Sequence, residues 1–168
     1  MKMLSIRAGK PAVTMILAGC FLVAAALPAL AGLGDNVGSI QSDAAVMRGA
    51  MAQPSREDLD AAQSGSYSVK TFVTENGVTV REYAAPSGTV FGVAWRGHRP
   101  PDLNVLLSSY YPEYSSASAA KTHRDLHRSV TASPNAIVTM SGHMGHVVGR
   151  AYVPSLVPSG VDAKAVVK

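Results

Sequence analysis

Residues 67–96 read YSVKTFVTENGVTVREYAAPSGTVFGVAWR. Apolar and polar side chains alternate over 67–73 and again over 78–83, which is the pattern of strands that have one solvated face. Glu75-Asn76-Gly77 separates these two runs, and Pro86-Ser87-Gly88 follows the second. Both triplets favour turns, because each ends in a glycine that tolerates positive φ. We therefore predict three consecutive strands that form an antiparallel meander.

The third strand of this meander, 89–96, is apolar on both faces. Phe91, Val93 and Trp95 lie on one face, and the residues between them are also small or apolar. A strand with this pattern needs cover on both sides, so we place it in the middle of the sheet. Gly92 within it indicates either a β-bulge or a close approach by another element.

An amphipathic helix is predicted after the meander. Asp102 is a favourable N-cap residue, and large apolar side chains then recur at helical spacing. They are Leu103, Leu106, Leu107, Tyr110, Tyr111 and Tyr114. Pro112 should end or kink the helix near Tyr111. We favour packing of this stripe on the sheet; the alternative is that the tyrosines bind a sugar or a peptide.

The remaining C-terminal part contains a second sheet segment. The small residues of 115–120 predict a linker, and 121–129 predict a short helical or irregular stretch. The β-rich runs 135–140 and 147–153 predict a strand pair, joined through a connection that contains two glycines. The tail is expected to lie along the surface, with a candidate edge strand at 165–167.

Residues 1–31 resemble a secretory leader. Basic residues come first, the apolar run 12–27 follows, and Ala29-Leu30-Ala31 has the small-x-small pattern that signal peptidase accepts. We expect cleavage before Gly32 and a periplasmic or secreted mature protein.

Two alternatives to simple cleavage remain open. Leu17-Ala18-Gly19-Cys20 has the form of a lipoprotein acylation site, with Cys20 as the lipidated residue. Plain secretion is favoured because 21–30 continues the apolar run, where a lipoprotein normally turns polar. A retained transmembrane anchor is the third choice, since Pro28 interrupts the run.

The segment 32–65 predicts little regular structure. Glycines punctuate a polar and Ala-rich stretch in which Val37 and Ile40 are the best strand candidates. Ser55 can cap one short helix that extends through Leu59. The low content of large apolar residues otherwise favours a mobile segment.

Without the leader, the charge and cysteine content of the chain change. Three of the 15 Lys and Arg residues lie in the leader, which leaves 12 basic against 11 acidic residues, a net charge of +1. The pI of 9.4 is therefore mainly a property of the leader, and we expect no nucleic-acid partner. The single Cys also lies in the leader, so the mature chain has neither a thiol nucleophile nor a disulfide.

Several short motifs in the mature chain together resemble one family. They are Val80-Arg81-Glu82-Tyr83, Gly88-Thr89-Val90-Phe91, Trp95, Pro101-Asp102-Leu103, Gly142-His143-Met144 and Gly149-Arg150-Ala151-Tyr152-Val153-Pro154. This set is similar to exported proteobacterial proteins grouped as domain of unknown function 2844. The resemblance implies an envelope or secreted location and no particular activity.

Four of the five histidines come in two pairs. The pairs are His123 with His127 and His143 with His146, and Met140 and Met144 lie beside the second pair. A spacing of four residues places two imidazoles on one face of a helix, where they can bind a metal. Imidazole with thioether suits copper, and imidazole alone suits zinc. The simpler interpretation is that these side chains are solvated or close a turn by hydrogen bonding.

The sequence has no recognisable catalytic constellation. It lacks a Gly-x-Ser-x-Gly motif and a phosphate-binding loop, and Ser141 is near His143 only in sequence. The carboxylates of Glu57, Asp58 and Asp60 fit a solvated helix start. We therefore predict a protein that is not an enzyme and that uses no cofactor.

Charged residues within the strands predict an ion pair that stabilises the sheet. Arg81 and Glu82 are expected to pair across strands with Arg96 or Arg150.

These observations predict an α+β domain over 66–168. It has an antiparallel sheet of about five strands, a three-strand meander plus a C-terminal hairpin, with one helix packed on it. Part of the second sheet face would remain uncovered. The leading hypothesis is a non-enzymatic envelope factor that binds a partner protein or an exported polymer through that face, with no transmembrane span after cleavage. The alternative is a periplasmic metal-binding protein that uses the His/Met cluster.

Overall fold

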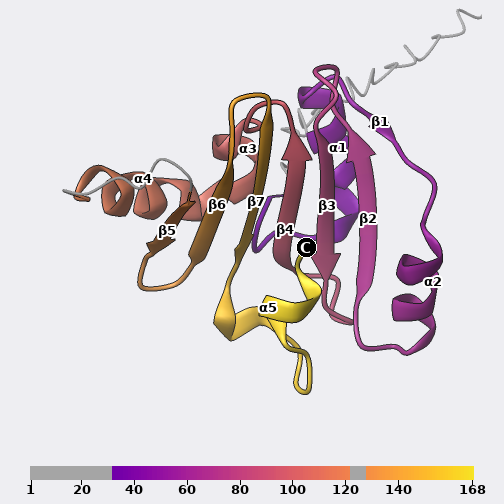
Figure 1. Cartoon of the computed structure of the whole chain (residues 1–168). Helices are drawn as coiled ribbons and strands as arrows, with labels where there is room; N and C mark the ends of the chain where they lie inside the picture. The colour runs from indigo at the N-terminus through magenta and orange to yellow at the C-terminus, as the bar shows by residue number, and fades with distance from the viewer. Residues whose placement is uncertain (1–31, 122–127) are drawn as a thin grey trace, which may run out of the picture.

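A seven-stranded antiparallel sheet forms the centre of the computed structural model, which describes residues 32–121 and 128–168 (Figure 1). The strands are β1 (Ala50–Met51), β2 (Ser68–Val73), β3 (Thr79–Ala84), β4 (Val90–Gly97), β5 (Arg128–Ala132), β6 (Ile137–His143) and β7 (His146–Tyr152). Their order in the sheet is β1-β2-β3-β4-β7-β6-β5. The meander therefore joins the C-terminal hairpin through β4 and β7.

Helices lie on both sides of this sheet. They are α1 (Ile40–Val46), α2 (Arg56–Gln63), α3 (Leu103–Leu107), α4 (Tyr111–Ala119) and α5 (Ala163–Val166), with short 3-10 turns at Val37–Ser39, Ser108–Tyr110 and Pro154–Leu156. Figure 1 shows α1 and α3 behind the sheet and α5 in front of it. None of these described helices has the length and apolar character needed to span a membrane.

The predicted meander is confirmed. β2, β3 and β4 pair in sequence order, and Gly77 and Gly88 have the positive φ values, 72° and 84°, that the two turns require. β4 is the central strand, and its residues from Val90 to Trp95 are all buried. Both interpretations of Gly92 hold. The register with β3 shifts beside it, and a Cβ at this position would lie 2.7 Å from the Val167 side chain. The prediction that Phe91 shares a face with Val93 and Trp95 was wrong, because this irregularity interrupts the alternation and Phe91 packs in a different core cluster.

The main core lies between the sheet and the helices α1 and α3, on what we call the covered face. Its buried side chains include Leu33, Ile40, Phe72, Val80, Val93, Trp95, Leu106 and Leu107. The predicted tyrosine stripe packs against this same cluster. The Trp95 indole lies directly on Gly149, where a Cβ would come within 2.2 Å of the ring.

The prediction of about five strands was too low, because two edge strands have weak sequence patterns. β1 is only two residues long and exposed. β5 contains one buried side chain, Thr131, so its alternation carries little apolar signal. Arg128 and Ser129 belong to β5, which corrects the predicted helical or irregular stretch at that point. The rest of that prediction, 122–127, lies outside the described residues.

The N-terminal segment also differs from its prediction, because it contains α1, β1 and α2. Val37 and Ile40 belong to a 3-10 turn and to α1, and not to a strand. Leu33 and Ile40 are buried in the main core. The predicted cap is confirmed, since Ser55 and Asp58 form a reciprocal capping box at the start of α2.

The predicted helix after Asp102 forms in two parts. Asp102 caps α3 as expected, through a 2.9 Å hydrogen bond from the Asn104 amide. The break occurs at Ser108, whose φ is 46°, and Pro112 then sits in the first turn of α4. The linker predicted at 115–120 was wrong, because Ala and Ser residues continue α4 to Ala119.

The predicted C-terminal hairpin is confirmed as β6 and β7, with Met144 and Gly145 in its turn. The candidate edge strand at 165–167 was wrong. Asp162 caps α5 by accepting a hydrogen bond from the Lys164 amide, so the chain turns into a helix there. Val167 then inserts its side chain over Gly92.

The covered face also contains an unusual carboxyl group, that of Glu82. Its side chain is completely buried, and neither carboxyl oxygen has a hydrogen-bond partner among the described residues. Burial raises the pKa of Glu82 to about 9, and the nearby carboxylates of Asp43 and Asp35 act in the same direction. Glu82 is therefore protonated in the folded protein at neutral pH.

This buried acid should make stability fall as pH rises. In the unfolded chain Glu82 ionises near its ordinary pKa of 4.5, whereas in the folded chain it stays protonated up to about pH 9. Between these values the free energy of unfolding should decrease by up to about 1.4 kcal/mol per pH unit. Glu82→Gln keeps the shape of the neutral acid and removes the titration.

Urea unfolding from about pH 5 to about pH 8 checks this expectation. The free energy of unfolding of Glu82→Gln should fall less over this range than that of the wild type. Glu75→Gln, which removes an exposed carboxylate, is the matched control and should keep the wild-type slope. Parallel pH profiles for Glu82→Gln and the wild type would contradict the assignment.

Candidate functional site

The sheet face opposite the main core, here called the open face, is covered only in part. A second cluster of buried side chains, including Tyr83, Phe91, Ala163 and Val167, packs α5 onto its lower part (Figure 1). α2 lies beside β2 at one side. The central strands between these two covers keep their other side chains accessible.

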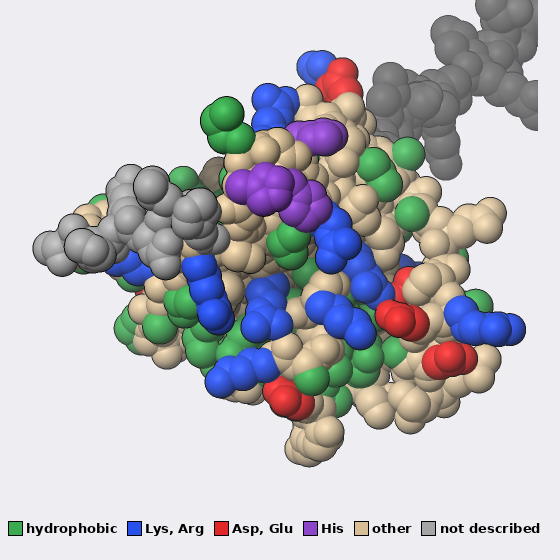
Figure 2. All heavy atoms as spheres, viewed as in Figure 1, with side chains coloured by type: hydrophobic (Ala, Val, Ile, Leu, Met, Phe, Trp, Pro, Cys, Tyr) green, Lys and Arg blue, Asp and Glu red, His purple; other side chains and the backbone are tan. Residues whose placement is uncertain are grey.

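Four arginines from four different strands point to this open face. They are Arg81 of β3, Arg96 of β4, Arg150 of β7 and Arg128 of β5. Residues that are directly opposite each other in neighbouring strands share a face, and so do residues two positions apart in one strand. By these two relations the register places all four arginines on the same face. Figure 2 shows the result as a band of Lys and Arg side chains across this face, with acidic side chains at its margin.

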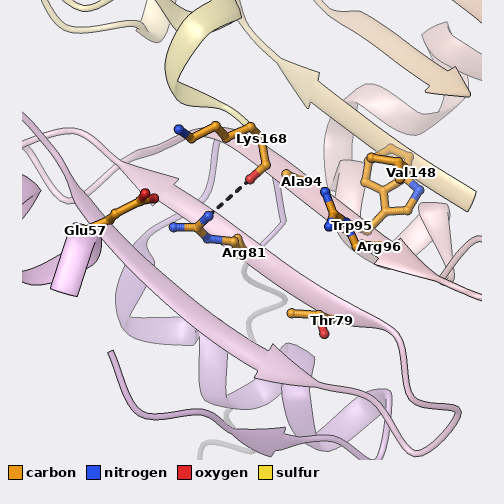
Figure 3. Close-up of a pocket in the computed structure, with 8 residues that line it drawn as sticks. All are labelled: Glu57, Thr79, Arg81, Ala94, Trp95, Arg96, Val148 and Lys168. Carbon is orange, nitrogen blue, oxygen red and sulfur yellow. Dashed lines mark hydrogen bonds between the residues drawn. The ribbon is translucent and has the colours of Figure 1, made fainter. Parts of the chain in front are cut away.

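A groove of about 400 Å³ opens at the centre of the open face. It is lined by Glu57, Thr79, Arg81, Ala94, Trp95, Arg96, Val148 and Lys168 (Figure 3). Short side chains from β3, β4 and β7 form its floor, and Lys168 reaches over it from the end of the segment after α5. The groove thus combines three basic side chains and one acidic side chain with a floor of short side chains.

Arg81 is held at the side of the groove by Asp58 of α2. Their side chains form an ion pair at 2.5 Å, in which Asp58 is almost completely buried. Burial opposes ionisation of Asp58, but hydrogen bonds from Ser55 and Arg81 outweigh it and lower the pKa of the carboxyl. Asp58 is therefore an anion that fixes α2 to β3.

This ion pair corrects two predictions. Asp58 is not part of a solvated helix start, because α2 turns it toward the sheet. The expected pair of Arg81 and Glu82 with Arg96 or Arg150 does not form. Adjacent strand residues point to opposite faces, so Glu82 enters the covered face while the arginines stay on the open one.

α5 and the segment after it are tied to the open face by polar contacts. The Tyr83 hydroxyl donates to the backbone oxygen of Lys168 at 2.7 Å, and Arg81 donates to the same oxygen at 3.3 Å. Arg150 donates to the backbone oxygen of Lys164 at 2.6 Å. The Arg150 contact engages a donor without neutralising the charge of Arg150, since the Lys164 carbonyl oxygen carries no full charge.

Arg96 is the least constrained cation of the groove. Its side chain is exposed, and among the residues that the structure describes it has no hydrogen bond or ion pair. It lies between Thr79 of β3 and Val148 of β7 in the register. A guanidinium in this state is available to an external anion.

The structure brings together one of the two predicted histidine pairs. His143 and His146 are opposite each other at the end of the hairpin, with ring centroids 5.8 Å apart. His98, which sequence reasoning did not select, lies near them, with its Nδ1 2.8 Å from the Gly145 carbonyl oxygen. The contact fits a protonated Nδ1 that donates to that oxygen. Figure 2 shows histidines gathered at the upper edge of the open face.

The other members of the predicted metal site are not assembled there. His123 and His127 lie outside the described residues. Met140 packs against the main core, whereas Met144 is 97% exposed in the hairpin turn. Over 32–121 and 128–168, no group of three or more His, Cys, Asp or Glu side chains has the arrangement that could hold a metal ion.

The chemistry of the groove favours binding of an anion. Among the described residues that line it, Thr79 is the only one with a hydroxyl group, and none is a histidine. The lining residues therefore form no nucleophile–base pair. Arg96 and Lys168 can pair with a carboxylate or phosphate, and the short floor residues can lie against a flat or extended ligand.

Comparison with known proteins yields one match. No curated protein and no solved structure matches the chain. The model of one protein family matches residues 29–166, which is most of the chain. The chain therefore belongs to the family described as "Protein of unknown function (DUF2844)".

Proposed function

We propose that this is an exported, non-enzymatic binding factor of the bacterial envelope, which holds a partner protein or an exported polymer on its open face. The observation that supports the proposal is the central groove, where an exposed and unpaired Arg96 lies beside a floor of short side chains. The leader pattern at 1–31 supports export.

The sheet face is a better binding surface than either edge of the sheet. β1 is too short to template a further strand. Lys121 lies along β5 and donates to the Thr131 hydroxyl at 2.7 Å and to the Val130 carbonyl oxygen. The groove, in contrast, is built on central strands, whose side chains are held in fixed positions by the sheet.

A photo-reactive amino acid in the groove tests this proposal. Placed at Val148 in cells that make the protein, it should give a cross-linked adduct of defined mass, because Val148 lines the groove. The same amino acid at Val46, which is 50% exposed on α1, is the control and should give no such adduct.

The charge reversal Arg96→Glu makes the test specific. It should remove most of the Val148 adduct without lowering the melting temperature, since Arg96 has no partner within 32–121 and 128–168. The proposal fails if Val46 gives the same adduct as Val148, or if Arg96→Glu leaves the adduct unchanged.

A second candidate function is metal binding, and the meeting of His143 and His146 favours it. His143 Nδ1 lies 3.1 Å from the Met144 carbonyl oxygen, so donation to that oxygen would leave Nε2 as the ligand atom. Two imidazoles bind zinc or copper weakly unless further ligands join them.

Native mass spectrometry of protein purified without chelator or affinity tag tests the metal candidate. A stoichiometric ion that is lost in His143→Ala/His146→Ala and retained in His98→Ala would support a site made by the hairpin pair. Protein that carries no metal and takes up neither zinc nor copper on titration would exclude this candidate.

A further inference from the structure

We infer that the occupant of the open face is an extended acidic polysaccharide, whose carboxylates pair with arginines of successive strands. This inference rests on the proposed function and names the class of its ligand. The inference is based on a stripe of four arginines that crosses the sheet. They are Arg81 of β3, Arg96 of β4, Arg150 of β7 and Arg128 of β5.

The register arranges these arginines as a zigzag of two rows. Arg81 and Arg150 both lie opposite Ala94, from either side of β4. Arg96 and Arg128 lie in the other row. Val148 and Ser141 stand between them, and each residue of the row is opposite the next across neighbouring strands. The two rows are two residues apart along the strands.

The zigzag gives the stripe a regular spacing. Neighbouring strands are about 4.8 Å apart and two strand residues span about 6.8 Å, so Arg81, Arg96 and Arg150 follow one another at about 8 Å. Arg128 is two strands beyond Arg150, about 12 Å away by the same geometry. Repeated cations at such intervals fit a ligand with repeated anionic groups better than a single small anion.

Most of the positive charge of the stripe is not neutralised within the protein. Asp58 neutralises Arg81, and Glu57 stands at the same end of the groove. Arg96 and Arg128 are exposed and make neither an ion pair nor a hydrogen bond with another described residue. In the part of the chain that the structure describes, Arg150 donates hydrogen bonds to the backbone oxygens of Lys164 and Val167 and to no acidic side chain. These guanidinium groups can each bind a carboxylate through two parallel hydrogen bonds.

The surface between the arginines suits a sugar chain. The registers bring Thr79, Thr139 and Ser141 to the open face, where their hydroxyls can hydrogen-bond to sugar hydroxyls. The intervening Ala94 and Val148 are short, so a chain can lie close to the strands between the arginines. A polymer that presents hydroxyls and carboxylates along its whole length complements this pattern.

Other anionic macromolecules fit the open face less well. Protein interfaces centre on clusters of large apolar or aromatic anchors, whereas the two exposed large apolar side chains that the registers place on this face, Val73 of β2 and Val130 of β5, are separated by four strands. A nucleic-acid site needs a strongly basic domain. Residues 32–168 have a net charge of only +1, with acidic side chains at the margin of the band.

Titration of the purified protein with oligogalacturonate tests the inference by calorimetry. We expect binding that weakens with added salt, and no binding of a neutral glucan oligomer of the same length. Arg96→Gln/Arg128→Gln should weaken the affinity about tenfold. Arg48→Gln, which removes an exposed cation paired with Glu75 away from the stripe, should leave the affinity unchanged.

Each other outcome has a defined meaning. Equal affinity for polyglutamate of the same charge would overturn the assignment to a polysaccharide. Absence of oligogalacturonate binding while the Val148 cross-link persists would overturn this inference and leave the proposed function in place. Loss of both signals would overturn both. Circular dichroism of the double variant, whose two arginines have no partner among the described residues, separates lost binding from lost structure.

Discussion

Burial of β4 on both of its faces is the constraint on which the rest of this structure depends. On the covered face, Val93 and Trp95 need α1 and α3 to exclude water. On the open face, Phe91 and Ala94 need the segment around α5, and Val167 completes that cover over Gly92. Where the cover of the open face ends, β4 passes from buried Ala94 to exposed Arg96, and the groove lies at that boundary.

The same alternation gives neighbouring residues of β3 opposite environments. Glu82 points into the covered face, where it is buried without a hydrogen-bond partner and stays neutral. Arg81 points to the open face, where Asp58 and the backbone oxygen of Lys168 hold it. The core therefore accepts one uncharged acid, while the charged arginine positions α2 and the last residues beside the groove.

Periodicity and turn chemistry were sufficient to predict the elements with strong local signals. These were the meander with its two glycine turns, the Asp102 cap and the C-terminal hairpin. Periodicity and turn chemistry failed where the local signal was weak or where contacts between distant residues decide the local structure. β5 has a single buried residue, and Val167 packs over Gly92, which is far away in sequence, instead of continuing an edge strand.

The candidate site depended on information that the sequence pattern lacks. Arg81, Arg96 and Arg150 each stood out only as a charged residue within a strand, and the expectation was that they pair within the sheet. The proximity of these arginines depends on strand order. Because β4 pairs with β7, residues more than fifty positions apart in the sequence become neighbours in the sheet. Since none of Arg96, Arg128 and Arg150 has an acidic partner among the described residues, the sheet holds cations near one another without internal neutralisation. Such an arrangement costs stability through mutual repulsion, and an external anion is what would relieve it.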